Sequence, residues 1–152
     1  MLLPTLSVRE QIVSDIQKLR EEHAELVVLV GKLGVAVDLP EPPPFLELFA
    51  LRRDLTSTLI GHLKAEDWAL YPRLMESKDA RIAATANAFS DEMGGLAAAF
   101  NIYSTRWSAM SITSDWNGFC HESKAIIDTL TCRITRENRE LYPLIDEIDQ
   151  AA

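Results

Sequence analysis

The sequence has few basic residues and no long hydrophobic run. Its 152 residues include 15 lysines and arginines against 23 aspartates and glutamates, which gives a net charge of −8. This balance argues against binding to nucleic acids and anionic membranes, which require a basic surface. No apolar run reaches the roughly 20 residues of a transmembrane helix. Residues 1–10 have no basic stretch ahead of an apolar one, as a signal peptide would. We therefore expect a cytoplasmic protein that binds neither nucleic acid nor membrane.

Cysteines and strand signals are also scarce. Cys120 and Cys132 are the only cysteines. On one helix they would lie about 18 Å apart, at about 1.5 Å per residue, which is too far for a disulfide. Their spacing is not that of a zinc site. We interpret them as two buried or half-buried free thiols in a reducing cytosol. Sustained alternation of apolar and polar residues, which indicates strands, is missing.

Hydrophobic residues instead recur at helical spacing along most of the chain. They predict four helices, at about residues 7–33, 45–74, 80–108 and 114–148. Ser7 and Glu10 form a capping box at the first start, and glycines at 31 and 34 are expected to end that helix. Residues 34–44 contain four prolines and predict a stiff extended connector. We predict one domain over residues 1–152, an all-α, antiparallel up-down four-helix bundle.

A near-duplicated segment is the most informative feature present. Residues 62–72, HLKAEDWALYP, recur 71 positions later as residues 133–143, RITRENRELYP. Positions four apart share a helix face, so each copy directs a nitrogen side chain and a carboxylate to the same side. Helical bundles build carboxylate metal sites in this way. The second copy, however, has Arg133 where the first has His62, and a guanidinium does not ligate a cation. The proline of each copy is predicted to kink or end its helix.

Several ionisable residues fall on the apolar faces of the predicted helices. Because a lone buried charge is costly, they are expected to be paired or bound to metal, and to meet at one height in the core. These residues are His23, His62, Glu66, Arg133 and Glu137.

Other polar and aromatic residues have simpler interpretations. Asp67 is expected on a solvated helix face. His121 is expected to be a partly exposed helix residue rather than a ligand. Trp68, Trp107 and Trp116 are expected to pack in the core or at the bundle ends.

With these residues, the chain resembles the hemerythrin-like family of HHE cation-binding domains over essentially its whole length. The resemblance implies a four-helix bundle that holds two bridged irons through histidines and two bridging glutamates. The positions that match the ligands of that family are His23, His62, Glu66 and Glu137. Met93 and Arg133 stand where the family has histidines on the third and fourth helices. The resemblance therefore implies a metal pocket in which two ligand positions have been replaced.

The preferred hypothesis is that Arg133 takes the place of one metal and bridges Glu66, Glu137 or both. Met93 would fill space at the second metal position. A di-iron centre is then disfavoured. The predicted function is a non-enzymatic sensory, regulatory or binding module, since no catalytic triad or substrate cleft is visible. It would act through a protein partner or as a homodimer across a bundle face.

Two alternatives remain open. The four matching residues form a two-histidine, two-carboxylate set that suits a single Zn²⁺, Mn²⁺ or Fe²⁺ ion, with Arg133 swung out of the coordination sphere. Such a protein would bind O₂ or NO, handle iron or sense oxidative stress. In the other alternative, the same four residues titrate together and make the pocket responsive to pH.

Overall fold

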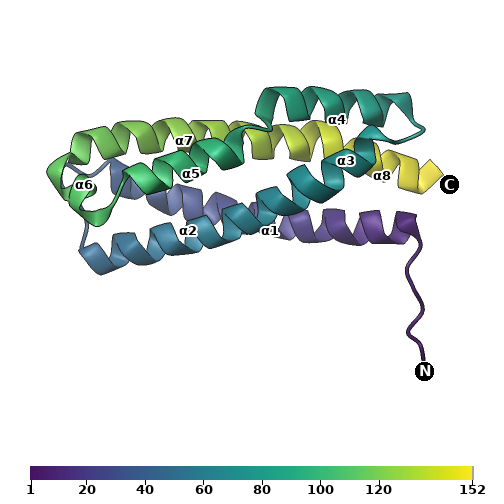
Figure 1. Ribbon diagram of the computed structural model, residues 1–152, viewed down its shortest axis with the longest axis horizontal. Coiled ribbons are helices and arrows are strands. Elements are labelled where there is room, and N and C mark those ends of the chain that lie inside the picture. Colours follow the sequence, from purple (N-terminus) through teal and green to yellow (C-terminus); the bar gives the residue numbers. More distant parts are fainter. Residues whose placement is uncertain (152) are drawn as a thin grey trace.

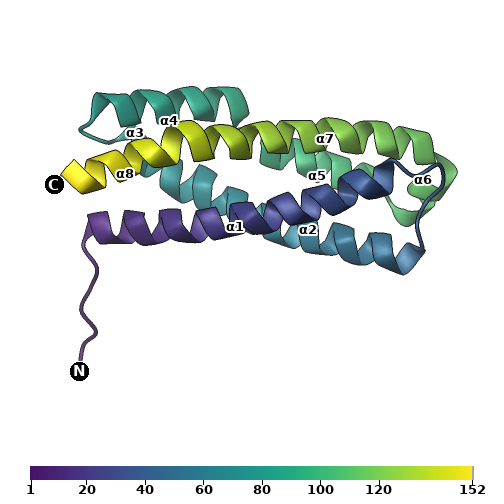
Figure 2. The ribbon, with the colours of Figure 1, turned by 180° about the vertical axis from the view of Figure 1, so that it is seen from behind.

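The computed structural model describes residues 1–151, with side chains up to Glu147, and this range contains helices and no strands. Four antiparallel rods make up the bundle (Figures 1 and 2). In chain order they are α1 (Val8–Val37); α2 (Phe45–Ala65) with η1 (Glu66–Leu70) and α3 (Tyr71–Met75); α4 (Ala80–Met93) with α5 (Leu96–Arg106); and α7 (Trp116–Arg136) with η2 (Glu137–Leu141) and α8 (Tyr142–Ala151). The short α6 (Ala109–Ser114) closes one end. The predicted all-α bundle is confirmed. Among these helices, none has the length and hydropathy that a membrane-spanning segment needs.

The first helix begins as predicted and ends later than predicted. Ser7 Oγ accepts a hydrogen bond from the Glu10 amide, and the Ser7 amide donates to the Glu10 carboxylate at 2.8 Å. Gly31 and Gly34 do not end the helix, which continues to Val37. Both glycines keep negative φ angles, and the helical residues around them are buried in the core. Packing of that face outweighs the weak helix preference of glycine.

The third rod is broken, although the sequence predicted one continuous helix. The break lies at Gly94 and Gly95, between α4 and α5, and the two helices are offset in both views (Figures 1 and 2). A Cβ atom at Gly94 would collide with the carbonyl oxygen of Ser90. Glycine is therefore required at position 94, because the backbone that leaves α4 lies close to the last turn of that helix.

The two prolines neither end nor sharply interrupt their rods. Each follows a π-helical turn, in which the amide of Tyr71 donates to Glu66 and the amide of Tyr142 donates to Glu137. These hydrogen bonds span five residues instead of four. Because a proline has no amide donor and clashes with the carbonyl four residues before it, a widened turn lets the helix continue. Both π turns begin at the predicted inward glutamates.

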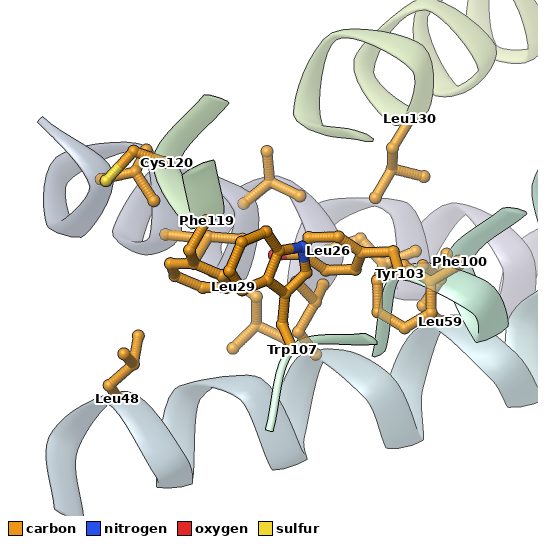
Figure 3. Packing of buried hydrophobic residues seen from close by; sticks show 14 of the residues in the cluster. Leu26, Leu29, Leu48, Leu59, Phe100, Tyr103, Trp107, Phe119, Cys120 and Leu130 are labelled. Carbon is orange, nitrogen blue, oxygen red and sulfur yellow. The ribbon is translucent and has the colours of Figure 1, made fainter. Parts of the chain in front are cut away.

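The core consists of two apolar clusters. The larger one fills the end of the bundle near α6 and contains Phe100, Tyr103, Trp107, Trp116 and Phe119 (Figure 3). The smaller one packs α1, α3, α4 and α8 around Tyr71 and Tyr142 at the other end. The predicted packing role is confirmed for two tryptophans, but Trp68 is 74% exposed. Along α1, His23 lies between Leu19 of the smaller cluster and Leu26 of the larger one. Apolar packing therefore closes the histidine in from both sides.

Leu26 and its neighbour Val27 provide a matched test of this core. Leu26 is fully buried, whereas Val27 is mostly exposed. We expect Leu26→Ala to lower the free energy of unfolding by about 2–5 kcal/mol, because it removes buried methyl groups and leaves a cavity. Val27→Ala should change it by no more than about 0.5 kcal/mol. Urea unfolding followed by circular dichroism measures both, and equal effects would contradict the arrangement described.

Candidate metal centre

The five predicted ionisable residues meet between the two apolar clusters. All of them are at most 2% exposed. One ligand atom from each of four residues lies within 4.8 Å of the other three, and these residues are His23, His62, Glu66 and Glu137. They come from α1, α2, η1 and η2, so the group joins three of the four rods. The structure thus brings the predicted ligands together, and cation binding by them stays a prediction.

Each buried carboxylate presents one oxygen to Arg133 and the other to the histidines. Arg133 Nη2 lies 3.3 Å from Glu66 Oε2, and Arg133 Nε lies 3.4 Å from Glu137 Oε2. On the opposite side, His23 Nε2 lies 3.6 Å from Glu66 Oε1 and 3.3 Å from Glu137 Oε1. His62 Nε2 also contacts Glu66 Oε1. Both glutamates therefore bridge two positions, one held by the guanidinium and the other facing the imidazoles.

Hydrogen bonds from outside the pocket orient both imidazoles. His23 Nδ1 lies 2.7 Å from Asn138 Oδ1, and His62 Nδ1 lies 3.2 Å from Glu22 Oε1. Because these oxygens only accept, each Nδ1 carries the proton, and each Nε2 points into the pocket. Metal-binding histidines are usually fixed by an outer acceptor in this way. The sequence pattern gave no indication of Glu22 or Asn138 in this role.

Two buried atoms on the histidine side make no hydrogen bond of regular geometry, although each lies close to one other member of the pocket. They are His62 Nε2 and Glu137 Oε1, and both belong to the four-residue group. A buried polar atom without a good hydrogen bond costs free energy. Such an atom therefore indicates a group with a role other than hydrogen bonding, such as that of a metal ligand. An imidazole nitrogen and a carboxylate oxygen are both good ligands for Zn²⁺, Mn²⁺ or Fe²⁺. The donor atoms on this side therefore fit a divalent cation.

Arg133 makes further contacts that hold its guanidinium in place. Nη2 donates to Asp67 Oδ1 at 2.6 Å, Nη1 donates to the Met93 backbone carbonyl at 3.1 Å, and the group lies 5.6 Å from the centre of the Tyr71 ring. Asp67 was expected on a solvated face, and this expectation was wrong: the π turn that starts at Glu66 also brings the next side chain to the guanidinium. Met93 is half-buried and provides its carbonyl to Arg133. That its side chain replaces a ligand stays a prediction.

Two tyrosines complete the pocket, and the sequence analysis missed both. Tyr71 donates to Glu137 Oε2 at 2.5 Å, and Tyr142 donates to Glu66 Oε1 at 3.4 Å. Each tyrosine thus bonds the carboxylate of the other repeat. The signal was available in the sequence, because in both copies the tyrosine follows the inward glutamate by five residues, the hydrogen-bond spacing of a π turn.

Burial and close contact shift the pKa values of the pocket in opposite directions. Burial disfavours the charged form of His23, but hydrogen bonds to Glu137, Glu66 and Asn138 outweigh it and raise its pKa to about 9. Burial and the negative charge of Glu66 raise the pKa of Glu137 to about 7. Burial also acts to raise the pKa of Glu66, but hydrogen bonds from its neighbours hold it well below its usual range. The two carboxylates therefore compete for the positive charge around them.

The remaining candidates lie away from this group. His121 is exposed on α7, as expected for a residue that is not a ligand. Both cysteines are free, as predicted, and Cys120 is buried. The prediction that Cys132 is also buried or half-buried was wrong, because its side chain is exposed on α7.

Removal of the Arg133 charge is expected to destabilise the fold strongly. Arg133→Met leaves two buried carboxylates without their closest fixed cation, and we expect the free energy of unfolding to fall by about 3–5 kcal/mol. Lys124→Met on the same helix removes a charge that is 55% exposed and pairs with Asp38, and it should cost under about 1 kcal/mol. Denaturant titration of both variants without added metal measures the difference. Equal stability of Arg133→Met and the parent protein would show that Arg133 does not neutralise the pair.

Comparison with known proteins agrees with this geometry. The family model described as the hemerythrin HHE cation binding domain matches residues 14–145. The match includes every residue of the four-residue group and both π turns. Searches among curated proteins and among solved structures give no match. The chain therefore belongs to the hemerythrin family of HHE cation-binding domains.

Proposed function

We propose that this protein is a non-enzymatic regulatory module that responds to a single divalent cation. His23, His62, Glu66 and Glu137 would hold the cation, and Arg133 would supply fixed positive charge at the second position between the carboxylates. The observation that carries the proposal is the division of both carboxylates, with Oε2 toward Arg133 and Oε1 toward the histidines. Arg133 therefore need not swing away for a cation to bind, contrary to the expectation from sequence.

The charges of the buried groups support one cation over two. Three carboxylates, those of Glu66, Asp67 and Glu137, surround the single guanidinium of Arg133. When all are ionised, two negative charges are left over. Buried charge must be neutralised. Without a cation, protonated His23 would supply part of the missing positive charge. One divalent cation would displace that proton and, beside neutral histidines, would balance both remaining negative charges. A second divalent cation would leave two excess positive charges unless an added anion balanced them.

The closed pocket favours a regulatory role over catalysis on a substrate of ordinary size. The four proposed ligands and Arg133 are at most 2% exposed, which leaves no surface for a metabolite to contact. A cation held there would supply two positive charges to the carboxylates. It would also link three rods: α1, the rod of α2 and η1, and the rod that contains η2. Because it would bind the folded state and not the unfolded chain, its binding would stabilise the bundle. The concentration of available cation would thus determine how strongly these three rods are held together.

A calorimetric titration tests the stoichiometry. We expect the chelator-treated protein to bind one Zn²⁺ or, without oxygen, one Fe²⁺ per chain. His23→Ala should weaken binding by more than the roughly 10–100-fold that loss of an outer-shell partner costs. His121→Ala, which changes an exposed histidine, should leave the affinity unchanged. No binding by the parent protein would overturn the proposal in favour of a cation-free pocket.

A second site should be restored by returning histidines to the two replaced positions. We expect the double variant Arg133→His, Met93→His to bind two iron ions per chain, because it removes the fixed charge and adds two ligands. Elemental analysis of protein purified without oxygen or chelators counts the metal. The single variant Met93→His is the control and should still bind one ion, since Arg133 remains. Two ions in the parent protein would contradict the assigned role of Arg133.

A further inference from the structure

Residues 1–6 form an apolar arm that leaves the bundle at the start of α1 (Figures 1 and 2). Four of these residues, Met1, Leu2, Leu3 and Leu6, have large apolar side chains that are more than half exposed. Scattered exposed leucines are ordinary, but several on one short segment present a contiguous apolar surface to water. Burial of that surface would be favourable. The arm therefore has the composition of a segment that binds an apolar groove.

An apolar groove of about 570 Å³ lies beside the point where the arm begins. Its apolar lining comes from α1, α3, α4 and α8: Val8, Ile12, Val13, Leu74, Ile82 and Ile145. The rest of the lining is polar and consists of Arg9, Arg73, Glu76 and Ser77. This volume is in the range of pockets that enclose several apolar groups. Six extended residues span up to about 20 Å, enough for several side chains of an arm to enter one groove. The groove and the arm thus match in chemistry and in scale.

The local backbone directs the arm away from the groove of its own chain. The capping box holds Ser7 in an extended conformation, with φ −63° and ψ 160°, and so fixes the direction in which the arm leaves α1. Pro4 restricts its own φ and keeps Leu3 extended. Between Pro4 and Ser7 only two residues remain to reverse the chain.

We propose that the arm of one copy docks in the groove of a second copy of this chain. Because each copy has both an arm and a groove, the exchange is reciprocal and closes a symmetric dimer. The arm and groove of this chain are chemically complementary, whereas the net charge of −8 disfavours an anionic lipid surface as the occupant. This inference does not depend on cation binding, since the groove residues lie outside the four-residue group.

Sedimentation velocity over a concentration series tests the dimer. We expect the full-length parent protein to reach twice the mass of one chain. The arm variant Leu2→Ser, Leu3→Ser, Leu6→Ser should remain monomeric. The groove variant Val8→Asp should do the same, because it places a charge in the apolar groove. Both changes affect exposed side chains, and an aspartate in the first turn of a helix is favourable, so both variants should keep the circular dichroism spectrum of the parent.

The matched control is Val27→Ser, Val28→Ser, which changes exposed apolar residues of α1 outside the groove. This variant should still form the dimer. A parent protein that stays monomeric at all concentrations would overturn the proposal, and would do so even if the arm folded onto its own groove. A dimer that persists in either the arm variant or the Val8→Asp variant would also overturn it, because the association would then use another surface.

Discussion

Two fully buried carboxylates facing one another, those of Glu66 and Glu137, constrain the rest of this structure. Neither can remain ionised in an apolar interior unless positive charge lies close by. Arg133 supplies that charge on one side of both groups, and His23 and His62 face the other side. The tyrosines and Asp67 add further hydrogen bonds to these groups, and two apolar clusters pack on either side. The need to neutralise this pair thus determines which polar side chains meet at this height of the core.

This pocket differs from one that holds two metals in the source of its positive charge. A guanidinium is permanent, since it is never deprotonated at physiological pH and no chelator removes it. A cation on the histidine side would instead be exchangeable. Of the three positive charges that would balance Glu66, Asp67 and Glu137, one is therefore built into the chain, and the other two would depend on the surroundings. Under the proposed function, this asymmetry would let a member of a cation-binding family keep its fold without metal and still respond to one.

Much of the bundle and its polar centre could be predicted from the sequence, because both depend on helical spacing. The pairs His62 with Glu66 and Arg133 with Glu137 share a helix face by their separation alone, and His23 follows from the apolar stripe of α1. What could not be predicted depends on departures from regular spacing. Asp67 reaches Arg133 because a π turn begins one residue earlier, and periodicity cannot anticipate that turn.

The glycines also show that helix ends could not be predicted from the sequence alone. Gly31 and Gly34 were expected to end a helix and do not, whereas Gly94 and Gly95 interrupt one that was predicted to continue. A side chain would meet nothing at the first pair but would strike the preceding turn at Gly94. Each place has two glycines within four residues. Contacts made after folding decide the outcome, and these are not visible in a single sequence.

A crystal structure with anomalous scattering data, collected after the protein is supplied with Fe²⁺ or Zn²⁺, tests the central claim most directly. The account predicts one anomalous peak per chain, beside His62 Nε2 and Glu137 Oε1, with Arg133 still paired to the opposite oxygens of Glu66 and Glu137. Two peaks between the carboxylates, with the guanidinium displaced, would show that Arg133 does not take the place of a cation.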